Sequence, residues 1–420
     1  MPKIKESFYI LYRKIVAYCN SALYILCSFL PIQKDKIAIC TFEGRTGFGC
    51  NPRYIVEELH KRNDTYRFYW FVNDMDKIFP SYIRKVKNNA WNRARHLSTA
   101  KIWIDNYRKP YGTRKRKGQF YFQTWHGSIG FKSIGLWRGS AFSRMAYLVS
   151  KNDSDMIDYV TIDSEWCREM FPKGLVYEGE FLKTGAPRCD VLYGDRKKAR
   201  IEFRKRFSLH EQDHVVMFAP TFREGKKDGV RQVFSEEWTI DFERMLRNLE
   251  KRFGGTWYLC IRVHPQLACQ FQQDFKAAFL ADRMMDVSQE DDLYEILAAM
   301  DAFITDYSSA AMDAGFTHMP VFIYADDIEQ YVCDRGSSLW NFSSEFGAPV
   351  PNNKVMTPGI HTVLPYSVAR NNEELEQNIL SFDQETYHSG LLEFERAVGL
   401  VFDGQASRRV ADKIEKCIND

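Results

Sequence analysis

The sequence has no Cys-x-x-Cys pair, although ten cysteines are spread along its 420 residues. Structural zinc sites and thioredoxin-type redox sites need closely spaced cysteines, so neither class of protein is indicated. Several cysteines stand in apolar, strand-like stretches such as Ile39-Cys40 and Leu259-Cys260-Ile261. We therefore expect reduced core cysteines without a catalytic role, as in a cytosolic protein.

An excess of one sign of charge is also lacking, because 58 Lys and Arg residues and 55 Asp and Glu residues leave a formal net charge of only +3. A chain with so little excess charge is not expected to bind nucleic acid. Its basic residues gather in short runs, at residues 108–109, 114–117 and 200–206. Such runs are typical of a solvated face, and the alternative is contact with an anionic lipid surface or a polyanionic substrate.

The N-terminal segment lacks an apolar run long enough to span a bilayer, since the uninterrupted run covers only residues 22–32. No small-residue cleavage site follows that would define a signal peptide. Residues 8–31 are rich in aromatic side chains but are interrupted by Arg13, Lys14 and Asn20. This pattern favours an amphipathic helix lying in the membrane interface, and the alternative is a helix packed on the protein itself.

Segments with the pattern of buried strands alternate with amphipathic helical segments along the chain. One series of strands is expected at residues 36–42, 67–72, 100–105 and 119–127, and a second at 214–220, 257–265, 302–304 and 321–324. Such alternation predicts parallel sheets with helices on both faces, and 420 residues are too many for one core. The fold class is α/β, with two doubly wound, Rossmann-like domains facing across a cleft, a layout that resembles the GT-B fold.

The expected boundaries follow from these patterns. We expect a membrane-associating helix at residues 1–33, one Rossmann-like domain at residues 34–205, a second at residues 206–385 and C-terminal helices at residues 386–420. The resemblance to the GT-B fold implies that the first of these domains is the acceptor-side domain and the second the donor-binding domain. Between the first strand and helix lies a loop with Gly44, Gly47 and Gly49. It lacks the order of a dinucleotide or P-loop motif, so we interpret it as a loop that admits substrate.

Three loops carry polar side chains directly after predicted strands, where parallel sheets bind ligands. They are residues 124–128 with Lys132 close behind, residues 262–265, and residues 305–309. His126 is suited to take a proton near neutral pH, whereas His264 and Arg262 could neutralise charge near a diphosphate. Ser308 and Ser309 precede a helix whose N-terminus attracts anions. The alternative is that the histidines are structural and the serines only cap the helix.

Six short motifs then follow one another in an order that resembles the CDP-glycerol:glycerophosphotransferase family. They are Trp125-His126-Gly127, Gly185 to Asp190, Ala219 to Arg223, Arg262 to Pro265, Ile304 to Ser309, and Tyr324 to Gly336. Members of this family are teichoic-acid primases and polymerases of bacterial cell walls and capsules. The resemblance implies a GT-B fold and transfer of a polyol phosphate, most simply glycerol phosphate, from a CDP-polyol to a hydroxyl of a lipid-linked or polymeric acceptor.

The resemblance also implies roles for individual residues. His126 would be the base on the acceptor hydroxyl, with Trp125, Gly127, Ser128 and Lys132 on the acceptor side, and His264 would act near the donor diphosphate. The donor-binding residues would be Arg223, Arg262, Thr305, Asp306, Ser308, Ser309, Asp327 and Glu329. It further implies a peripheral protein on the cytoplasmic face of the membrane.

No metal and no cofactor besides the CDP-polyol substrate is required by the sequence. Asp291-Asp292 is interpreted as a helix-start pair and Asp326-Asp327 as part of a donor-side loop. The family commonly continues Trp-His-Gly with Thr-Pro-Leu-Lys-Lys, whereas this chain has Ser128-Ile129-Gly130-Phe131-Lys132. The acceptor and the choice between CDP-glycerol and CDP-ribitol therefore stay open. The rival hypotheses are a glycosyltransferase that uses a sugar nucleotide and a non-enzymatic scaffold.

Overall fold

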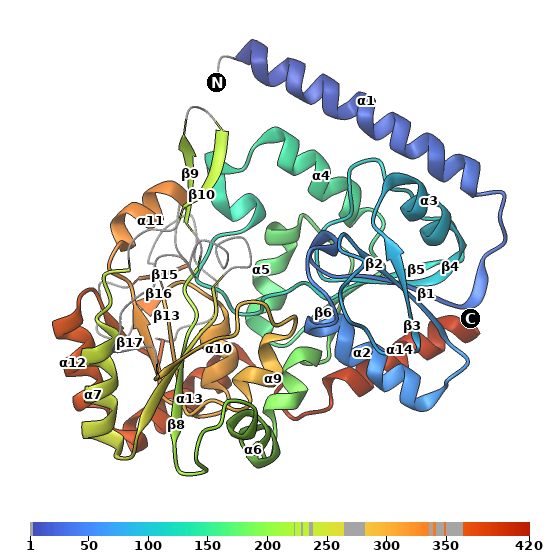
Figure 1. Cartoon of the computed structure of the whole chain (residues 1–420). Helices are drawn as coiled ribbons and strands as arrows, with labels where there is room; N and C mark the ends of the chain where they lie inside the picture. The colour runs from blue at the N-terminus through green and yellow to red at the C-terminus, as the bar shows by residue number, and fades with distance from the viewer. Residues whose placement is uncertain are drawn as a thin grey trace. The chain divides into compact units, whose positions relative to one another are not determined.

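The computed structural model describes residues 3–221, 223–227, 230–234, 238–263, 282–335, 339–341, 348–349 and 364–420 (Figure 1). Only the backbone is described at residues 3–5, 223–227, 230–234, 332–335, 341 and 348–349. The chain divides into two compact units. The first contains residues 1–128, 134–190 and 400–420, and the second contains residues 129–133 and 191–399.

The first unit is built on a seven-stranded parallel sheet in the order β3-β2-β1-β4-β5-β6-β7. The strands are β1 (Gln33–Cys40), β2 (Arg67–Val72), β3 (Ile83–Lys87), β4 (Ala100–Asp105), β5 (Phe120–Gln123), β6 (Tyr159–Ile162) and β7 (Glu180–Lys183). The helices are α1 (Lys3–Cys27), α2 (Cys50–Arg62), α3 (Ala90–Thr99), α4 (Arg144–Ser154), α5 (Glu165–Leu175) and α14 (Ala406–Asn419). Short 3-10 helices cover Phe42–Gly44, Gly135–Ala141 and Pro187–Leu192.

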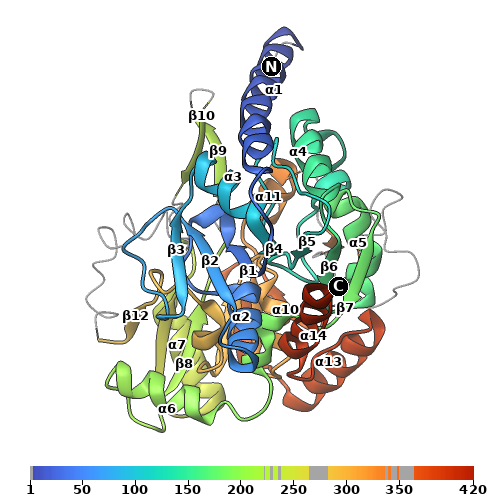
Figure 2. The same ribbon diagram turned by 90° about the vertical axis from the view of Figure 1, so that its right-hand side faces the viewer.

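Helices cover both faces of this sheet, as the view in Figure 2 shows. Successive residues of β1 point to opposite faces, so Ile37 and Ile39 pack with α2 and α14, whereas Ala38 and Cys40 pack with α1 and α3. All four side chains are buried. A strand buried on both faces reads as a continuous apolar run, which explains why the sequence identified β1 correctly.

The second unit has a six-stranded parallel sheet in the order β12-β11-β8-β13-β14-β17 and two short strand pairs. The sheet strands are β8 (His214–Phe218), β11 (Trp257–Ile261), β12 (Met284–Asp286), β13 (Ala302–Thr305), β14 (Val321–Tyr324) and β17 (Ser367–Ala369). The pairs are β9 (Arg223–Lys227) with β10 (Val230–Phe234), and β15 (Trp340–Asn341) with β16 (Ala348–Pro349). The helices are α6 (Lys197–Arg206), α7 (Phe242–Phe253), α9 (Leu293–Leu297), α10 (Ala310–Gly315), α11 (Ile328–Arg335), α12 (Asn372–Leu380) and α13 (Gln384–Val398).

The units do not divide where the sequence patterns indicated. The chain enters the second unit at residue 191 rather than 206. The reason is that Arg204 of α6 is buried and donates to Asp301 at 2.7 Å, which ties this helix to the second sheet. The C-terminal segment is also split, because α13 belongs to the second unit and α14 returns to the first. There Asp190 accepts hydrogen bonds from the N–H groups of Ala406 and Ser407.

The predictions on cysteines and basic runs have different outcomes. Seven of the eight described cysteines are buried thiols, as expected, and Cys19 is exposed. The basic run at residues 114–117 is partly structural, because Lys115 pairs with Asp158 and Arg116 donates to the carbonyl of Leu30 at 2.6 Å. Neither a purely solvated face nor a lipid contact describes these two side chains.

Helix α1 is docked on the first unit along one narrow ridge. Its buried residues are Ala17, Asn20, Tyr24 and Cys27, at helical spacing. Asn20 donates to the carbonyl of Tyr111 at 3.1 Å, and Ser21 donates to that of Gly112 at 2.8 Å. No described helix, α1 included, is long and apolar enough to cross a membrane.

A buried ionic network supports the loop that follows β4. Lys109 pairs with Asp105 at 2.5 Å, and both side chains are 3% exposed. The Asp153 carboxyl accepts hydrogen bonds from the Lys109 N–H at 3.0 Å and from the Tyr121 hydroxyl at 3.2 Å. Burial raises the pKa of Asp153 to about 7. The loop after β4 is therefore held by charges that cost free energy to bury and depend on one another.

The docking of α1 can be tested at Gly112, which has φ +86° and whose added Cβ would lie 2.2 Å from the carbonyl oxygen of Ala17. Gly112→Ala should lower the free energy of unfolding by about 1–3 kcal/mol for steric reasons, besides the backbone strain. Gly118 is the matched control, since it has the same φ and only Ile32 Cδ1 at 3.9 Å. Gly118→Ala should cost roughly 1 kcal/mol from backbone strain alone. If urea denaturation gave the same decrease in the free energy of unfolding for both variants, it would contradict this docking of α1.

The protonation of buried Asp153 predicts a pH-dependent stability. Because the folded-state pKa is raised, the proton is retained in the folded protein after the unfolded chain has lost it. Relative to Asp153→Asn, the wild-type free energy of unfolding should fall as the pH rises from about 4 to 7, by up to roughly 1.4 kcal/mol per pH unit. Denaturant titrations at several pH values measure this difference. A difference that is constant across that range would contradict a protonated Asp153.

Candidate active site

The candidate base, His126, lies in a loop that we name the histidine loop (residues 124–128), directly after β5. The loop begins where β4 and β5 end together, because the Thr124 N–H donates to the carbonyl of Asp105 at 2.8 Å. The His126 ring lies 2.7 Å through Nδ1 from the carbonyl oxygen of Asn106. A carbonyl can only accept, so Nδ1 carries the hydrogen and neutral His126 keeps its lone pair on Nε2. This is the protonation state that a general base needs.

Aromatic rings surround the His126 imidazole. Tyr107 stacks on it with ring centroids 5.5 Å apart, and Trp125 and Phe42 lie at 4.4 and 5.1 Å. Trp125 adopts a left-handed backbone conformation with φ +51°. A bulky residue in that region costs about 1–3 kcal/mol and is concentrated at functional sites.

The glycine-containing loop after β1 lies against the same histidine. Phe42, Glu43 and Gly44 have φ values of +46°, +59° and +77° in succession. The Phe42 N–H donates to the Asn106 side-chain oxygen at 2.8 Å, so one asparagine holds both Phe42 and the His126 ring. Burial raises the pKa of the Glu43 carboxyl. The loop thus stands where a substrate-admitting loop was expected, and its contact with substrate stays a prediction.

The remaining acceptor-side candidates fall in both units. Trp125 and Ser128 are buried beside His126 in the first unit, and Gly127 separates them. Lys132 belongs to the second unit, since residues 129–133 cluster there. Its Nζ lies 5.9 Å from the centre of the Tyr331 ring, and the carbonyl of neighbouring Phe131 accepts from the Leu339 N–H at 2.9 Å. The loop that departs from the family pattern is therefore packed in the second unit.

Thr305 and Asp306, at the end of β13, bind protein groups in the structure. Thr305 is fully buried and its hydroxyl donates to the carbonyl of Ala219 at 2.6 Å. The Asp306 carboxylate accepts from the N–H of Thr221 at 2.8 Å and from its hydroxyl at 3.0 Å. Both residues join the loop after β8 to the end of β13. Their contact with a donor stays a prediction, and the structure gives them a supporting role.

The serine turn before α10 is more open. Ser308 and Ser309 are partly exposed, and the Ser308 hydroxyl accepts from the Ala310 N–H at 3.3 Å. Ser309 stands at the N-cap position, yet its side chain makes no capping hydrogen bond. Capping therefore accounts for Ser308 and leaves the side chain of Ser309 without that function.

Donor-side candidates after β14 contact the same turn. The Tyr307 hydroxyl donates to Asp327 at 2.8 Å, and the Tyr307 and Tyr331 rings stack 3.9 Å apart. Glu329 is exposed and pairs with Arg370 at 3.2 Å. The structure thus brings Asp327 next to the residues 305–309 loop within the second unit and leaves Glu329 at the surface.

Arg262, at the end of β11, holds a neighbouring loop. Its guanidinium donates to the carbonyls of Val287 at 3.1 Å and Glu290 at 2.8 Å, and burial lowers its pKa. His264 and the side chain of Arg223 lie outside the described residues, so the predictions for them stay untested.

The acidic pairs have protein partners as well. Asp292 caps α9 by accepting from the N–H groups of Tyr294 and Glu295 at 2.8 and 3.0 Å, which confirms its interpretation as a helix-start residue. Asp326 accepts a hydrogen bond from Thr239. Within the part of the chain that the structure describes, no group of three or more His, Cys, Asp or Glu side chains could hold a metal ion.

Several residues around His126 escaped the sequence analysis. Asn106 and Tyr107 follow β4 directly, and their polar character at a strand end was the signal that could have identified them. Asn51 of α2 and Arg188 of the 3-10 helix after β7 hold the histidine loop by hydrogen bonds. Arg188 belongs to a motif that the sequence analysis identified, but the neighbouring residues in the sequence do not predict that its side chain contacts Ser128.

Known proteins with similar sequences are enzymes of teichoic acid synthesis. The chain is 26% identical over 407 residues to a teichoic acid poly(glycerol phosphate) polymerase of Staphylococcus epidermidis, covering 95% of this chain. It is 24% identical to a teichoic acid glycerol-phosphate transferase of Staphylococcus aureus, covering 96% of this chain and 98% of that protein. The chain spans about half the length of two polymerases, 53% of the S. epidermidis protein and 45% of one from Bacillus subtilis.

The fold has a close counterpart among solved structures. The wall teichoic acid polymerase TagF superposes with a TM-score of 0.76 and 24% identity, over 99% of this chain and 97% of that chain. The GT-B fold class with two Rossmann-like units, expected from the sequence, is thereby confirmed. A model of the family described as CDP-Glycerol:Poly(glycerophosphate) glycerophosphotransferase matches residues 22–357. Because this match covers most of the chain and agrees with the six motifs, the protein belongs to the CDP-glycerol:poly(glycerophosphate) glycerophosphotransferase family.

Proposed function

We propose that this protein transfers a polyol phosphate, most simply glycerol phosphate, from a CDP-polyol to a hydroxyl of a lipid-linked or polymeric acceptor in the synthesis of a teichoic-acid-type cell-wall or capsule polymer. The observation that carries this proposal is the orientation of His126. In a chain of this family, an imidazole whose Nδ1 is held by the Asn106 carbonyl presents Nε2 as a base.

The chemistry assigned to His126 is proton removal from the acceptor. Nε2 takes the proton of the acceptor hydroxyl, and the oxygen then attacks the phosphorus that bears the polyol. A new P–O bond forms to the acceptor, the P–O bond to CMP breaks, and CMP leaves with the electron pair. The surrounding aromatic rings reduce the hydration of the imidazole and limit its rotation.

The donor is assigned to the second unit. The partly exposed serine turn before α10 supports this assignment, because its hydroxyls are suited to phosphate oxygens. No metal or further cofactor takes part in the proposed reaction. Glycerol is favoured over ribitol as the polyol, although a teichoic acid poly(ribitol-phosphate) polymerase of Bacillus spizizenii is 26% identical over 403 residues and keeps CDP-ribitol as the second donor to test.

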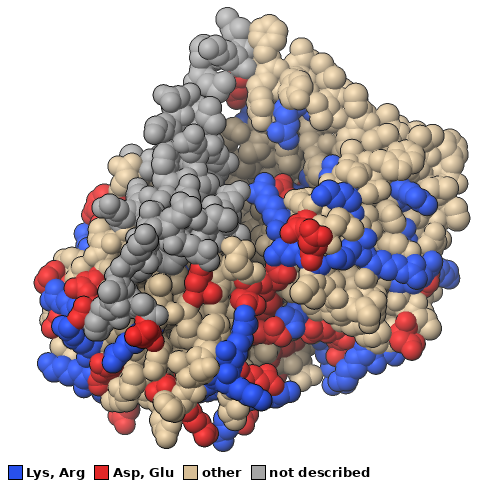
Figure 3. Space-filling model, viewed as in Figure 1, with Lys and Arg blue, Asp and Glu red and all other residues tan. Residues whose placement is uncertain are grey.

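Helix α1 is assigned to an anionic membrane surface on the cytoplasmic side, as a peripheral contact. Outside its narrow docked ridge, large apolar and aromatic side chains are exposed at Phe8, Leu11, Tyr12, Ile15, Val16, Tyr18, Ile25 and Leu26. The surface over α1 is mostly uncharged, whereas the rest of the view mixes both signs of charge (Figure 3). An exposed stripe of this kind suits insertion into the lipid headgroup boundary.

The proposed reaction predicts release of CMP by the wild-type protein from one CDP-polyol in the presence of membrane extract. His126→Ala should reduce this rate by about 10²–10⁴-fold, because a general base contributes that much. His210, exposed in the turn before β8, provides the control, and His210→Ala should release CMP at the wild-type rate.

The donor panel separates the proposal from its rivals. CDP-glycerol, CDP-ribitol and UDP-sugars are offered separately, and the polyol is identified by the donor consumed. Consumption of a UDP-sugar alone would identify a glycosyltransferase and overturn the proposal. Full cellular function of His126→Ala would favour the scaffold hypothesis instead.

The proposed membrane contact predicts that anionic phospholipid vesicles sediment the protein and zwitterionic vesicles do so less. Leu11→Asp with Ile15→Asp should abolish this sedimentation, because the charges oppose burial in lipid. Ile78 is the matched control, an 88% exposed apolar residue of the first unit outside α1. Ile78→Asp should sediment like the wild type, and an equal loss in both proteins would contradict a role specific to α1.

A further inference from the structure

A buried asparagine, Asn51, forms hydrogen bonds to the peptide groups before and after Trp125, the residue with a left-handed backbone conformation. Its Nδ2 donates to the carbonyls of Thr124 and Trp125, each at 3.1 Å. Its Oδ1 accepts from the Arg188 N–H at 2.9 Å. Asn51 is 1% exposed, so these bonds are shielded from water and costly to lose.

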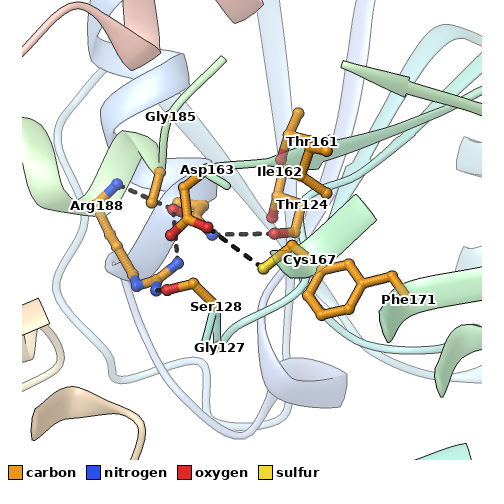
Figure 4. A pocket seen from close by; sticks show the side chains of 12 residues that line it. Thr124, Gly127, Ser128, Thr161, Ile162, Asp163, Cys167, Phe171, Gly185 and Arg188 are labelled. Carbon is orange, nitrogen blue, oxygen red and sulfur yellow. Dashed lines mark hydrogen bonds between the residues drawn. The ribbon is translucent and has the colours of Figure 1, made fainter. Parts of the chain in front are cut away.

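Arg188 continues this contact to the far end of the histidine loop. Its guanidinium donates to the Ser128 hydroxyl at 2.7 Å, and the residue is only 1% exposed. Figure 4 shows the Arg188 side chain reaching Ser128 beside Asp163, with Cys167 and Phe171 farther along the same cavity. A charged side chain is rarely buried to this extent without a structural or functional requirement.

The cavity beside Arg188 does not provide a ligand site. Its volume of about 10 Å³ is room for one water molecule and too little for a phosphate. The guanidinium therefore acts on the protein itself. Asn51 and Arg188 both donate hydrogen bonds to the histidine loop.

We propose that Asn51 and Arg188 form a positioning pair that fixes the histidine loop so that His126 Nδ1 stays on the Asn106 carbonyl. The pair holds residues 124, 125 and 128, on both sides of His126, against the left-handed φ of Trp125. Both residues are buried and donate hydrogen bonds to the histidine loop, so we assign their effect to the position of His126. The kinetic consequence rests on the proposed transferase function, whereas the effect on the histidine ring does not.

The experiment combines kinetics with NMR of the full-length protein carrying isotope-labelled histidine. Arg188→Lys, Arg188→Gln and Ser128→Ala are compared with the wild type. The nitrogen shifts of the imidazole report which nitrogen bears the hydrogen, and the His126 signal is assigned by its loss in His126→Ala. Cys167→Ala is the matched control, because Cys167 lines the same cavity but its thiol donates to Asp163 at 3.3 Å.

We expect the Arg188 variants to lose the fixed Nδ1–H signal of His126 and to show an averaged one. The kcat for CMP release should fall by about 10-fold or more with the KM for the CDP-polyol changed less than about twofold, since small misplacement of a catalytic group acts on the chemical step. The pH dependence of kcat should shift in the same variants. Cys167→Ala should keep the wild-type signal, kcat and pH profile.

An unchanged His126 signal in folded Arg188→Lys and Arg188→Gln would overturn the proposal, and so would an equal effect of Cys167→Ala. If the Arg188 variants fail to fold, Ser128→Ala tests the proposal, because it removes only the hydroxyl that accepts from Arg188 and should also lose the fixed Nδ1–H signal of His126. Ser128→Thr, which keeps a hydroxyl, should retain that signal. Absence of CMP release by the wild type would contradict the transferase function alone, since the NMR comparison needs no substrate.

Discussion

The shared end of strands β4 and β5 is the constraint on which the candidate site depends. Parallel neighbours deliver their next residues to one edge of the sheet, so Asn106 after β4 and His126 after β5 meet there. The Asn106 carbonyl selects the tautomer of the ring, while its side chain holds Phe42 from the loop after β1. Three consecutive strand ends in the order β1-β4-β5 thus contribute to one histidine.

These loops are held together by buried polar and charged groups. The loop after β4 is in contact with Asp105 and Asp153 through Lys109, and the histidine loop is in contact with Arg188 through Ser128. Apolar packing would be less costly, but it could not fix the positions of individual carbonyls. The left-handed φ of Trp125 shows why such directional contacts are needed, since hydrogen bonds on both sides must offset that strain.

The sequence predicted features with a local pattern, such as the buried strands. It did not predict features that depend on contacts between residues far apart in the chain, such as the boundary between the two units. Strands such as β1 and β8 are buried on both faces and read as apolar runs, so the two parallel sheets were predictable. Strands β3 and β7 are only partly buried and were not identified. The boundary at residue 191 was missed because it depends on Arg204 meeting Asp301.

The same distinction applies within the candidate site. Strand-end position made His126, Thr305 and Asp306 visible in the sequence, yet position alone did not separate groups that face substrate from groups that hold loops together. The hydrogen bonds help to make that separation: Thr305 and Asp306 bind the loop after β8, whereas the His126 ring is oriented through Nδ1 by the Asn106 carbonyl. Arg188 is the converse case, since its position in the sequence did not reveal that its buried side chain donates to Ser128 of the histidine loop. In a parallel α/β sheet, therefore, a polar residue at a strand end is evidence of the site's location, and its hydrogen-bond partners decide its role.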